Sequence, residues 1–246
     1  IIGGGPAGLE ATLSLARRGY SVAIADSEKE LGGRINMESK LPGMTSYKRV
    51  VDYRVNQINQ LNNVDVFLDN TLSPDDVLEL GFDHVVTATG SIWKPSIMDE
   101  KSAPVLIDKT ATIFTPEDVL NGCELKSPVI VFDFDYYYMG GLMAEFIKDL
   151  GHEVMIITPF DKVSPWSFNS NEIDDIELRL LEKDIRVLTQ HRIITVEDSS
   201  VKTIQKVSHE ENAIDRGSLV LVGFRKQNDS LYNQLNSSEA AFKASG

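Results

Sequence analysis

A glycine-rich segment at the start of the chain has the spacing of a phosphate-binding loop. Three glycines, Gly3, Gly5 and Gly8, follow two isoleucines and open a run of helix-forming residues. In such a loop the first glycine makes the tight turn, the second lets a pyrophosphate approach the backbone, and the third lets helix and strand pack closely. The phosphates lie on free N–H groups at the helix start. We therefore expect a pyrophosphate to bind at Gly3, Gly5, Pro6, Ala7 and Gly8.

An acidic residue ends the next apolar segment, Val22 to Ala25, which we expect to be a strand. Asp26 follows Gly8 at close to the spacing of about 20 residues that is typical of a ribose-binding carboxylate. Such a carboxylate accepts hydrogen bonds from both ribose hydroxyls, and its charge repels a 2′-phosphate. The alternative is an ordinary solvated acid in a turn. We expect Asp26 and the adjacent Ser27 to bind the ribose of an adenine nucleotide.

Size, charge and composition exclude several classes of function. The chain has 246 residues, enough for two domains, and a net charge of -13, which disfavours binding to nucleic acid or to an anionic membrane. We find no apolar run of the length that a bilayer crossing needs and expect a soluble, cytoplasmic protein. The single cysteine, Cys123, excludes intrachain disulfides and cysteine-ligated iron-sulfur sites, and the four histidines have no metal-binding spacing.

Strand and helix patterns alternate along the chain in two successive series, which predicts two α/β domains. In the first series we expect a helix from Pro6 to Arg18, a strand at Val22 to Ala25, a helix from Ser46 to Asn62, a strand at Val64 to Leu68, a capped helix at Ser73, and a strand at His84 to Ala88. Residues 91–125 have a loop-like pattern, apart from a capped helix at Thr115.

In the second series we expect strands at Val129 to Phe132 and Val154 to Ile157 flanking a helix that ends at Leu150, a helix from about Asn171 to Glu182, strands near residues 185–188, 192–196 and 201–207, and a last strand at Ser218 to Val222. The tail from Lys226 is expected to be an edge helix or partly disordered. Since the chain begins within a strand and without methionine, we expect it to be part of a longer polypeptide.

Two further residues follow the expected strand at His84 to Ala88. Thr89 and Gly90 lie where that strand ends, and open α/β sheets bind their ligands at the carboxyl ends of the strands. A tight turn that needs glycine explains the pair equally well. We count both residues as candidates for nucleotide binding.

Several segments resemble known flavoproteins. Asp26, residues 31–34 (Leu-Gly-Gly-Arg) and residues 85–90 resemble the two-domain pyridine nucleotide-disulfide oxidoreductases. Residues 38–43, 52–54, 81–85, 136–141 and 218–222 are similar to the C-terminal half of the trimethylamine, dimethylamine and histamine dehydrogenases. This resemblance covers nearly the whole chain.

The resemblance implies an α/β fold of two Rossmann-like, three-layer nucleotide-binding domains. Residues 1–98 with 226–246 would form an ADP- or FAD-binding domain truncated at both ends, and residues 99–225 a degenerate NAD-type domain inserted in it. The resemblance also implies contacts of Gly33 and Arg34 with the pyrophosphate, and of Thr71 and Leu72 with the adenine.

In this family, amine oxidation belongs to an upstream barrel that carries FMN and an iron-sulfur cluster, neither of which this chain could build. The chain would then be the part that binds ADP, or the ADP half of FAD, in an amine dehydrogenase-like oxidoreductase, without catalysis of its own. The barrel, an electron-transfer protein and a second copy of the chain are the macromolecular partners considered. An NAD(P)H:flavin reductase of the dienoyl-CoA reductase kind and a non-catalytic scaffold are the alternatives.

The second series lacks the glycines of the first. Asp133 and Asp135 follow its first strand, and Gly140 is the nearest counterpart of the helix-packing glycine. Carboxylates facing this loop would repel a pyrophosphate, and acids that cap the helix would occupy the same N–H groups. Either arrangement predicts that the second domain binds neither NADH nor NADPH. The aromatic run from Tyr136 to Tyr138 is interpreted as packing between the domains, with electron transfer or partner docking as the alternative.

Overall fold

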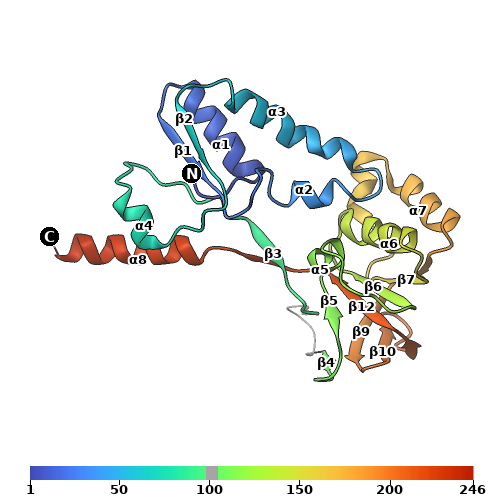
Figure 1. The fold of residues 1–246 in the computed structure, drawn as a ribbon. Coiled ribbons are helices and arrows are strands. Elements are labelled where there is room, and N and C mark those ends of the chain that lie inside the picture. The colour runs from blue at the N-terminus through green and yellow to red at the C-terminus, as the bar shows by residue number, and fades with distance from the viewer. Residues whose placement is uncertain (98–104, 246) are drawn as a thin grey trace. The chain divides into compact units, whose positions relative to one another are not determined.

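The chain divides into two compact units. The computed structural model describes residues 1–97 and 105–245 (Figure 1), so the predicted domain boundary between residues 98 and 99 lies outside the described residues. One unit comprises residues 1–92 and 227–246, and the other comprises residues 93–226. The second unit therefore interrupts the first along the chain.

The first unit is built around a helix that packs on two parallel strands. Its elements are α1 (Pro6–Arg17), β1 (Val22–Ala25), α2 (Ile35–Glu38), the 3-10 turn η1 (Thr45–Tyr47), α3 (Lys48–Ile58), β2 (Val64–Phe67), α4 (Pro74–Glu79) and α8 (Ser230–Ser245). Leu9 and Leu13 of α1 pack with Ile24 of β1 and with Val51 and Ile58 of α3 to form the core. The predicted strand at residues 22–25 is confirmed.

The chain start joins this sheet through a single residue. Ile2 forms parallel bridges with Ala25 on one side and with Thr87 on the other, while β1 and β2 pair in register from Val22 with Val64. The predicted strand at 84–88 is wrong as a continuous strand, because only the bridge at Thr87 forms. Ile2 makes both hydrogen bonds of this bridge. The N–H of Ile2 donates to the Val86 carbonyl oxygen at 2.8 Å, and the carbonyl oxygen of Ile2 accepts from Ala88 N–H at 2.7 Å. Because the neighbouring segment consists only of Ile1 and Ile2, it cannot form a longer ladder with residues 84–88.

The second unit has two sheets and two longer helices. Its elements are β4 (Leu106–Ile107), β5 (Ile113–Phe114), α5 (Pro116–Leu120), β6 (Val129–Asp133), α6 (Met139–Asp149), β7 (Val154–Ile157), the 3-10 turn η2 (Pro165–Ser170), α7 (Ile173–Glu182), β8 (Arg186–Leu188), β9 (His191–Val196), β10 (Ser200–Gln205), β11 (Glu211–Asp215) and β12 (Ser218–Val222). The segments that connect the units pair as β3 (Ser91–Trp93) and β13 (Arg225–Gln227).

A parallel sheet of strand order β5-β12-β6-β7-β8 forms the centre of this unit. Val131 of β6 lies between Val220 of β12 and Ile156 of β7. Every residue of β6 and β12 is buried, as expected for parallel strands that are covered on both faces. The second sheet, of order β11-β10-β9-β4, contributes Ile193 and Val201 to the core that it shares with β6 and β12.

Several short strands escaped the sequence prediction. Residues 91–125 contain β3, β4 and β5, which have only two or three residues each and thus carry no alternating pattern. The sequence does not predict β11, because Glu211, Asn212 and Asp215 are poor strand formers. Pairing with β10 keeps this segment extended. Ser218–Val222 is not the last strand, since β13 follows it. The tail forms α8, which confirms the helical alternative.

The two predicted helix caps are confirmed. The hydroxyl groups of Ser73, at the start of α4, and Thr115, at the start of α5, each accept a hydrogen bond from the N–H of the aspartate three residues later. The carboxylate of that aspartate accepts a hydrogen bond from the N–H of the cap residue. These reciprocal bonds satisfy N–H groups that a helix start otherwise leaves unpaired. Pro74 and Pro116 occupy the first helical position, where the missing N–H costs nothing.

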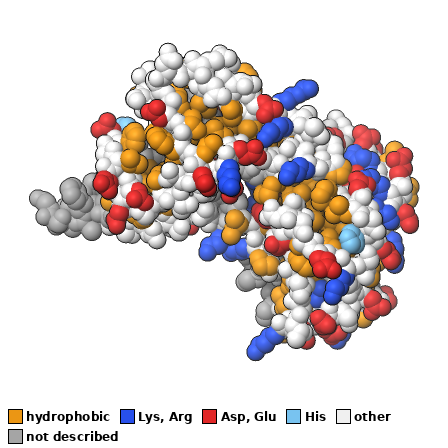
Figure 2. Space-filling view, in the orientation of Figure 1, with side chains coloured by type: hydrophobic (Ala, Val, Ile, Leu, Met, Phe, Trp, Pro, Cys, Tyr) orange, Lys and Arg blue, Asp and Glu red, His pale blue; other side chains and the backbone are white. Residues whose placement is uncertain are grey.

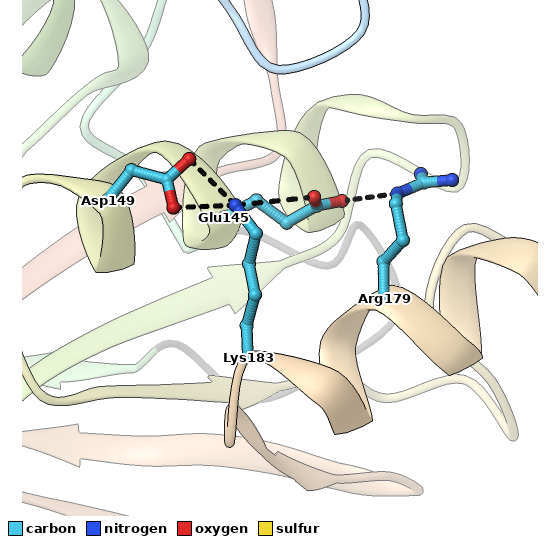
Figure 3. Close-up of polar contacts among 4 residues, drawn as sticks. All are labelled: Glu145, Asp149, Arg179 and Lys183. Atoms are coloured by element: carbon cyan, nitrogen blue, oxygen red, sulfur yellow. Dashed lines mark hydrogen bonds and ion pairs between the residues drawn. The ribbon is translucent and has the colours of Figure 1, made fainter.

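A buried carboxylate ties α6 to α7 (Figure 3). The side chain of Glu145 is 1% exposed, and its two oxygens lie 3.1 Å from Arg179 Nε and 3.8 Å from Lys183 Nζ. Lys183 also contacts Asp149 at 2.6 Å, and the Asp149 side chain is 53% exposed. Because a buried charge without its partners is costly, Glu145 is expected to stabilise the helix pair more than Asp149 does.

We predict that Glu145→Gln lowers the free energy of unfolding of the second unit by about 1–3 kcal/mol, since Arg179 and Lys183 lose their buried counter-charge. Asp149→Asn is the matched control and should cost less than about 1 kcal/mol, as exposed pairs do. Both tryptophans, Trp93 and Trp166, lie in the second unit, so urea unfolding followed by tryptophan fluorescence reports on it. Equal costs for the two variants would contradict the prediction.

Candidate nucleotide-binding site

The glycine loop between the chain start and α1 is packed too tightly for side chains at two of its positions. Gly3 has φ +105°, and a Cβ atom there would overlap the Ala88 carbonyl oxygen. A Cβ atom on Gly8 would overlap the carbonyl oxygen of Gly3. The first and third glycines thus perform the roles predicted for them, a tight turn and close packing of helix on strand.

The second glycine of the motif faces open space. A Cβ atom built on Gly5 would meet no described atom within 4 Å. Gly5 is also the N-cap residue of α1, where no side chain of the described chain caps the helix and no acidic residue lies in the first turn. The first-turn N–H groups and the positive end of the α1 dipole are therefore left for an anion.

Asp26 is attached to this loop by its carboxylate. The residue is 9% exposed; Oδ2 accepts a short hydrogen bond from Gly4 N–H, and Oδ1 accepts one from Glu28 N–H at 2.8 Å. A carboxylate has about four acceptor positions, so each oxygen retains one for a ribose hydroxyl. The solvated turn acid that the sequence left open is excluded, because Asp26 is buried and positions the glycine loop.

The loop at residues 31–34 lies against the glycine loop. Gly32 N–H donates to the Gly4 carbonyl oxygen at 2.8 Å, and a Cβ atom on Gly33 would lie 3.0 Å from Gly5 Cα. Arg34 is the N-cap residue of α2, and its Nε lies 3.4 Å from the buried carboxylate of Glu38. The Arg34 side chain is 46% exposed, so the rest of its guanidinium is accessible to an anion.

The other predicted residues are related to this loop through neighbouring backbone groups. Thr71 and Leu72 continue a segment whose Asn70 N–H donates to the Asp26 carbonyl oxygen at 2.9 Å, which places them beyond β2 on the Asp26 side. Ser27 is exposed next to Asp26. The backbone of Thr89 approaches Gly3.

The side-chain hydroxyl of Thr89, by contrast, is already used within the protein. It donates a short hydrogen bond to the Asn228 carbonyl oxygen, and Asn228 N–H donates to the carbonyl oxygen of Gly90 at 2.9 Å. Gly90 has φ +70°, which supports the turn interpretation of this pair. Thr89 and Gly90 thus bind the returning chain segment through these groups.

Sequence reasoning missed three residues of this arrangement. A Cβ atom on Gly4 would overlap the end of the Leu31 side chain and lie 2.9 Å from Asp26 Oδ2, so Gly4 is also closely packed. Glu28 and Asn228 provide the backbone groups described above. The run of three consecutive glycines was a usable signal for Gly4. Nothing local in the sequence marks Glu28 or Asn228, because they act through their backbone.

The corresponding junction of the second unit is filled by a carboxylate. Asp133 ends β6, is fully buried, and lies where a Cβ atom on Gly140 would overlap it. The expectation that Asp133 faces the loop is therefore corrected: burial against α6 turns it inward. Asp135 instead accepts a bond from Met139 N–H at 3.4 Å, the helix-capping alternative.

Burial raises the pKa of Asp133 to about 7, and the nearby charge of Asp135 adds to this increase, while backbone N–H groups of Asp135 and Ser164 oppose it. Among the described residues, Asp133 Oδ2 and Ser164 Oγ are buried without a hydrogen-bond partner. The junction is thus polar and closed. The space above Gly5, by contrast, is open and adjoins the first-turn N–H groups of α1.

The aromatic run beside this junction packs within the second unit. The Tyr136 ring meets Phe160 edge-on at 4.9 Å between centroids, and the Tyr137 ring lies 5.7 Å from Trp166. Tyr136 and Tyr137 are nevertheless about half exposed, and Figure 2 shows hydrophobic side chains on the visible face of each unit. The ring contacts of Tyr136 and Tyr137 described here lie within the second unit. Packing of the aromatic run between the two domains stays a prediction.

Two protein-family models match successive parts of the chain. Residues 1–119 match the pyridine nucleotide-disulphide oxidoreductase family, and residues 114–218 match the OYE-like second alpha/beta domain. Dimethylamine dehydrogenase of Hyphomicrobium sp. (strain x) is 26% identical over 275 residues, which cover 100% of this chain and 37% of that protein. The chain is homologous to the amine dehydrogenases. The resemblance inferred from the sequence is thereby confirmed.

Two solved structures of these homologues superpose closely. Histamine dehydrogenase from Rhizobium sp. 4-9 has a TM-score of 0.93 at 36% identity, covering 100% of this chain and 38% of that chain. The 6-hydroxypseudooxynicotine amine oxidase from Pseudomonas geniculata N1 has a TM-score of 0.91 at 38% identity, covering 96% of this chain and 36% of that one. The chain therefore corresponds to the C-terminal part of these homologues and to little more than a third of their length.

The described residues contain neither a candidate membrane span nor a candidate metal site. No helix there is long and apolar enough to cross a membrane. No group of three or more histidine, cysteine, aspartate or glutamate side chains in that part of the chain could hold a metal ion.

We predict that the contribution of Asp133 to the stability of the second unit falls as pH rises from about 4 to about 7. The folded state keeps the Asp133 proton through this range whereas the unfolded state, with the ordinary pKa of 3.8, releases it. The loss is at most about 4 kcal/mol and is complete above pH 7. Asp133→Asn should flatten this dependence and be more stable than the parent at pH 8. Urea unfolding at several pH values measures the free energy of unfolding of the parent and of Asp133→Asn. If this free energy depends on pH in the same way in both proteins, the prediction is refuted.

Proposed function

We propose that the first unit binds an adenine nucleotide, either ADP or the ADP part of FAD. The observation that carries this proposal is the open space above Gly5 at an uncapped helix start. A diphosphate fits that position, because it is anionic and needs backbone N–H groups rather than side chains. Asp26, with one free acceptor position on each oxygen, would then bind the ribose.

The proposal extends to the architecture of the whole protein. We infer that residues 1–98 with 226–246, and residues 99–225, are two Rossmann-like domains, the second inserted in the first. The parent protein would be a flavin-dependent, amine dehydrogenase-like oxidoreductase, consistent with its homology to dimethylamine and histamine dehydrogenases. FMN and an iron-sulfur cluster would then belong to an upstream barrel outside this chain.

In that setting the residues of this chain bind and orient a nucleotide and carry out no bond-breaking step. The N–H groups of the α1 start would bind the diphosphate, with the Arg34 guanidinium near it. Asp26 would fix the ribose while its bond to Gly4 N–H holds the loop. If FAD is the ligand, its flavin supplies redox chemistry when bound.

We predict that Gly5→Leu abolishes ADP binding, a loss of at least about 100-fold in affinity or roughly 2.7 kcal/mol. The leucine would occupy the diphosphate position, and since its Cβ atom meets no described atom within 4 Å, the fold should survive. Titration calorimetry with ADP measures the affinity, and thermal unfolding checks the fold.

Tyr20→Leu is the control for this variant, because it places a leucine at a position of the same unit that is 56% exposed. It should bind ADP as the parent does. Unchanged affinity of Gly5→Leu would exclude this placement of the nucleotide. The spectrum of any ligand released from the purified protein separates the remaining cases: a yellow extract indicates FAD, and adenine absorbance alone indicates ADP.

We also predict that the second unit binds neither NADH nor NADPH. Asp133 fills the space beside Gly140, and Asp135 already accepts a hydrogen bond from the first turn of α6. Titration with NADH, followed by its fluorescence in protein saturated with ADP, should show no saturable binding at micromolar concentrations. Saturable binding at one equivalent would instead favour the NAD(P)H:flavin reductase alternative.

A further inference from the structure

A groove opens the core of the second unit between its two sheets. Its volume is about 590 Å³, and its lining comes from the first residues of β6 and β7, from β8, and from four residues of β11. Met155, Leu188 and Ile214 contribute to this lining and are only partly buried, although all three pack against the central core cluster. Apolar side chains are therefore accessible from outside the unit.

One wall of the groove is a strand with a free edge. β11 is the terminal strand of its sheet and pairs only with β10 among the described strands. Arg216 N–H donates to the Ser199 carbonyl oxygen, and Gln205 N–H donates to that of Glu210. Because the residues of an antiparallel strand alternate in direction, Glu211, Ala213 and Asp215 must direct their N–H and C=O groups away from β10. Within the described strands these groups have no pairing partner, and they form a free edge along the groove.

The two faces of β11 differ in character. Asn212 and Ile214 stand opposite Thr203 and Val201, which are fully buried, so both lie on the inner face, where Ile214 is partly buried and Asn212 is exposed. Glu211, Ala213 and Asp215 lie on the outer face and are exposed. A strand that pairs with this edge would place alternate side chains in the groove and beside the two outer carboxylates.

The charges around the edge are mainly negative. Glu211 and Asp215 lie on the outer face and Glu153 lines the groove, against one lining cation, Arg186. Lys202 lies opposite Ala213, but its Nζ is already 2.9 Å from a Glu197 oxygen. The outer face thus favours basic side chains on an added strand.

We propose that the free edge of β11 and the adjoining groove bind an extended peptide segment in which apolar and basic residues alternate. The segment adds a strand to the sheet through the N–H and C=O groups of Glu211, Ala213 and Asp215. Its apolar residues pack on Met155, Leu188 and Ile214, and its basic residues lie beside the outer carboxylates. The proposal is independent of nucleotide binding by the first unit.

A second copy of the chain is a poorer occupant of this edge. Antiparallel pairing of β11 with itself about Ala213 would place Glu211 of each copy opposite Asp215 of the other. Like charges directly opposite are destabilising in antiparallel pairs, and such charges are a common way to protect edge strands.

The test measures the binding of a short labelled peptide of alternating valine and lysine by fluorescence anisotropy, with an alternating valine–glutamate peptide for comparison. The lysine peptide should bind the full chain, and the glutamate peptide should bind at least about tenfold more weakly. Ala213→Pro removes one edge N–H without disturbing the ladder to β10 and should weaken binding about tenfold or more. Ala213→Val keeps that N–H and is the matched control.

A charge-reversed variant gives a second test, whose result does not depend on how proline affects the fold. Glu211→Lys combined with Asp215→Lys should reverse the preference, so that the glutamate peptide binds better. Equal binding of the lysine peptide to Ala213→Pro and Ala213→Val, or an unchanged preference in the charge-reversed variant, overturns the proposal. A dimer in sedimentation that Ala213→Pro dissociates would assign the edge to a second copy and overturn it as well.

Discussion

The close approach of α1 to the strand before it sets the geometry of the first unit. Gly8 lies so near the Gly3 carbonyl that no side chain fits between them, and Gly3 is held equally close to Ala88. This contact aims the first-turn N–H groups of α1 into the space above Gly5. Asp26 fixes the loop from the other side through Gly4 N–H. Each proposed role in nucleotide binding depends on this packing.

The two units use the same strand–loop–helix junction for different purposes. In the first unit the junction leaves a space, lined by backbone groups, that suits an anion. In the second unit the Asp133 side chain fills it, and Gly140 makes room for a carboxylate rather than for a ligand. Burial of Asp133 has a cost, visible in its raised pKa and in an oxygen that has no partner among the described residues. A buried acid retained at such a cost is more compatible with a closed structural junction than with an open binding site.

Carboxylates occur both in the interior and on the surface of this protein. In the interior, Glu145 is paired with Arg179 of α7 and with Lys183 at the end of that helix, whereas Asp26 and Asp133 accept hydrogen bonds from backbone N–H groups. Other carboxylates lie on the surface, and at β11 they flank a free backbone edge. The same acidity that disfavours nucleic acid gives this edge its expected preference for basic partners.

The sequence by itself determined the parts of the structure that depend on local patterns. Strands β1, β7 and β12, both helix caps and the glycine loop followed from apolar runs, capping residues and glycine spacing, because these depend on neighbours in the chain. The tertiary structure alone decided that Asp133 turns inward and that Thr89 binds Asn228. It also decided that residues 84–88 form only a bridge and that β11 exists. Each of these depends on a partner distant in the chain, and local sequence does not encode which partner will supply a hydrogen bond or exclude water.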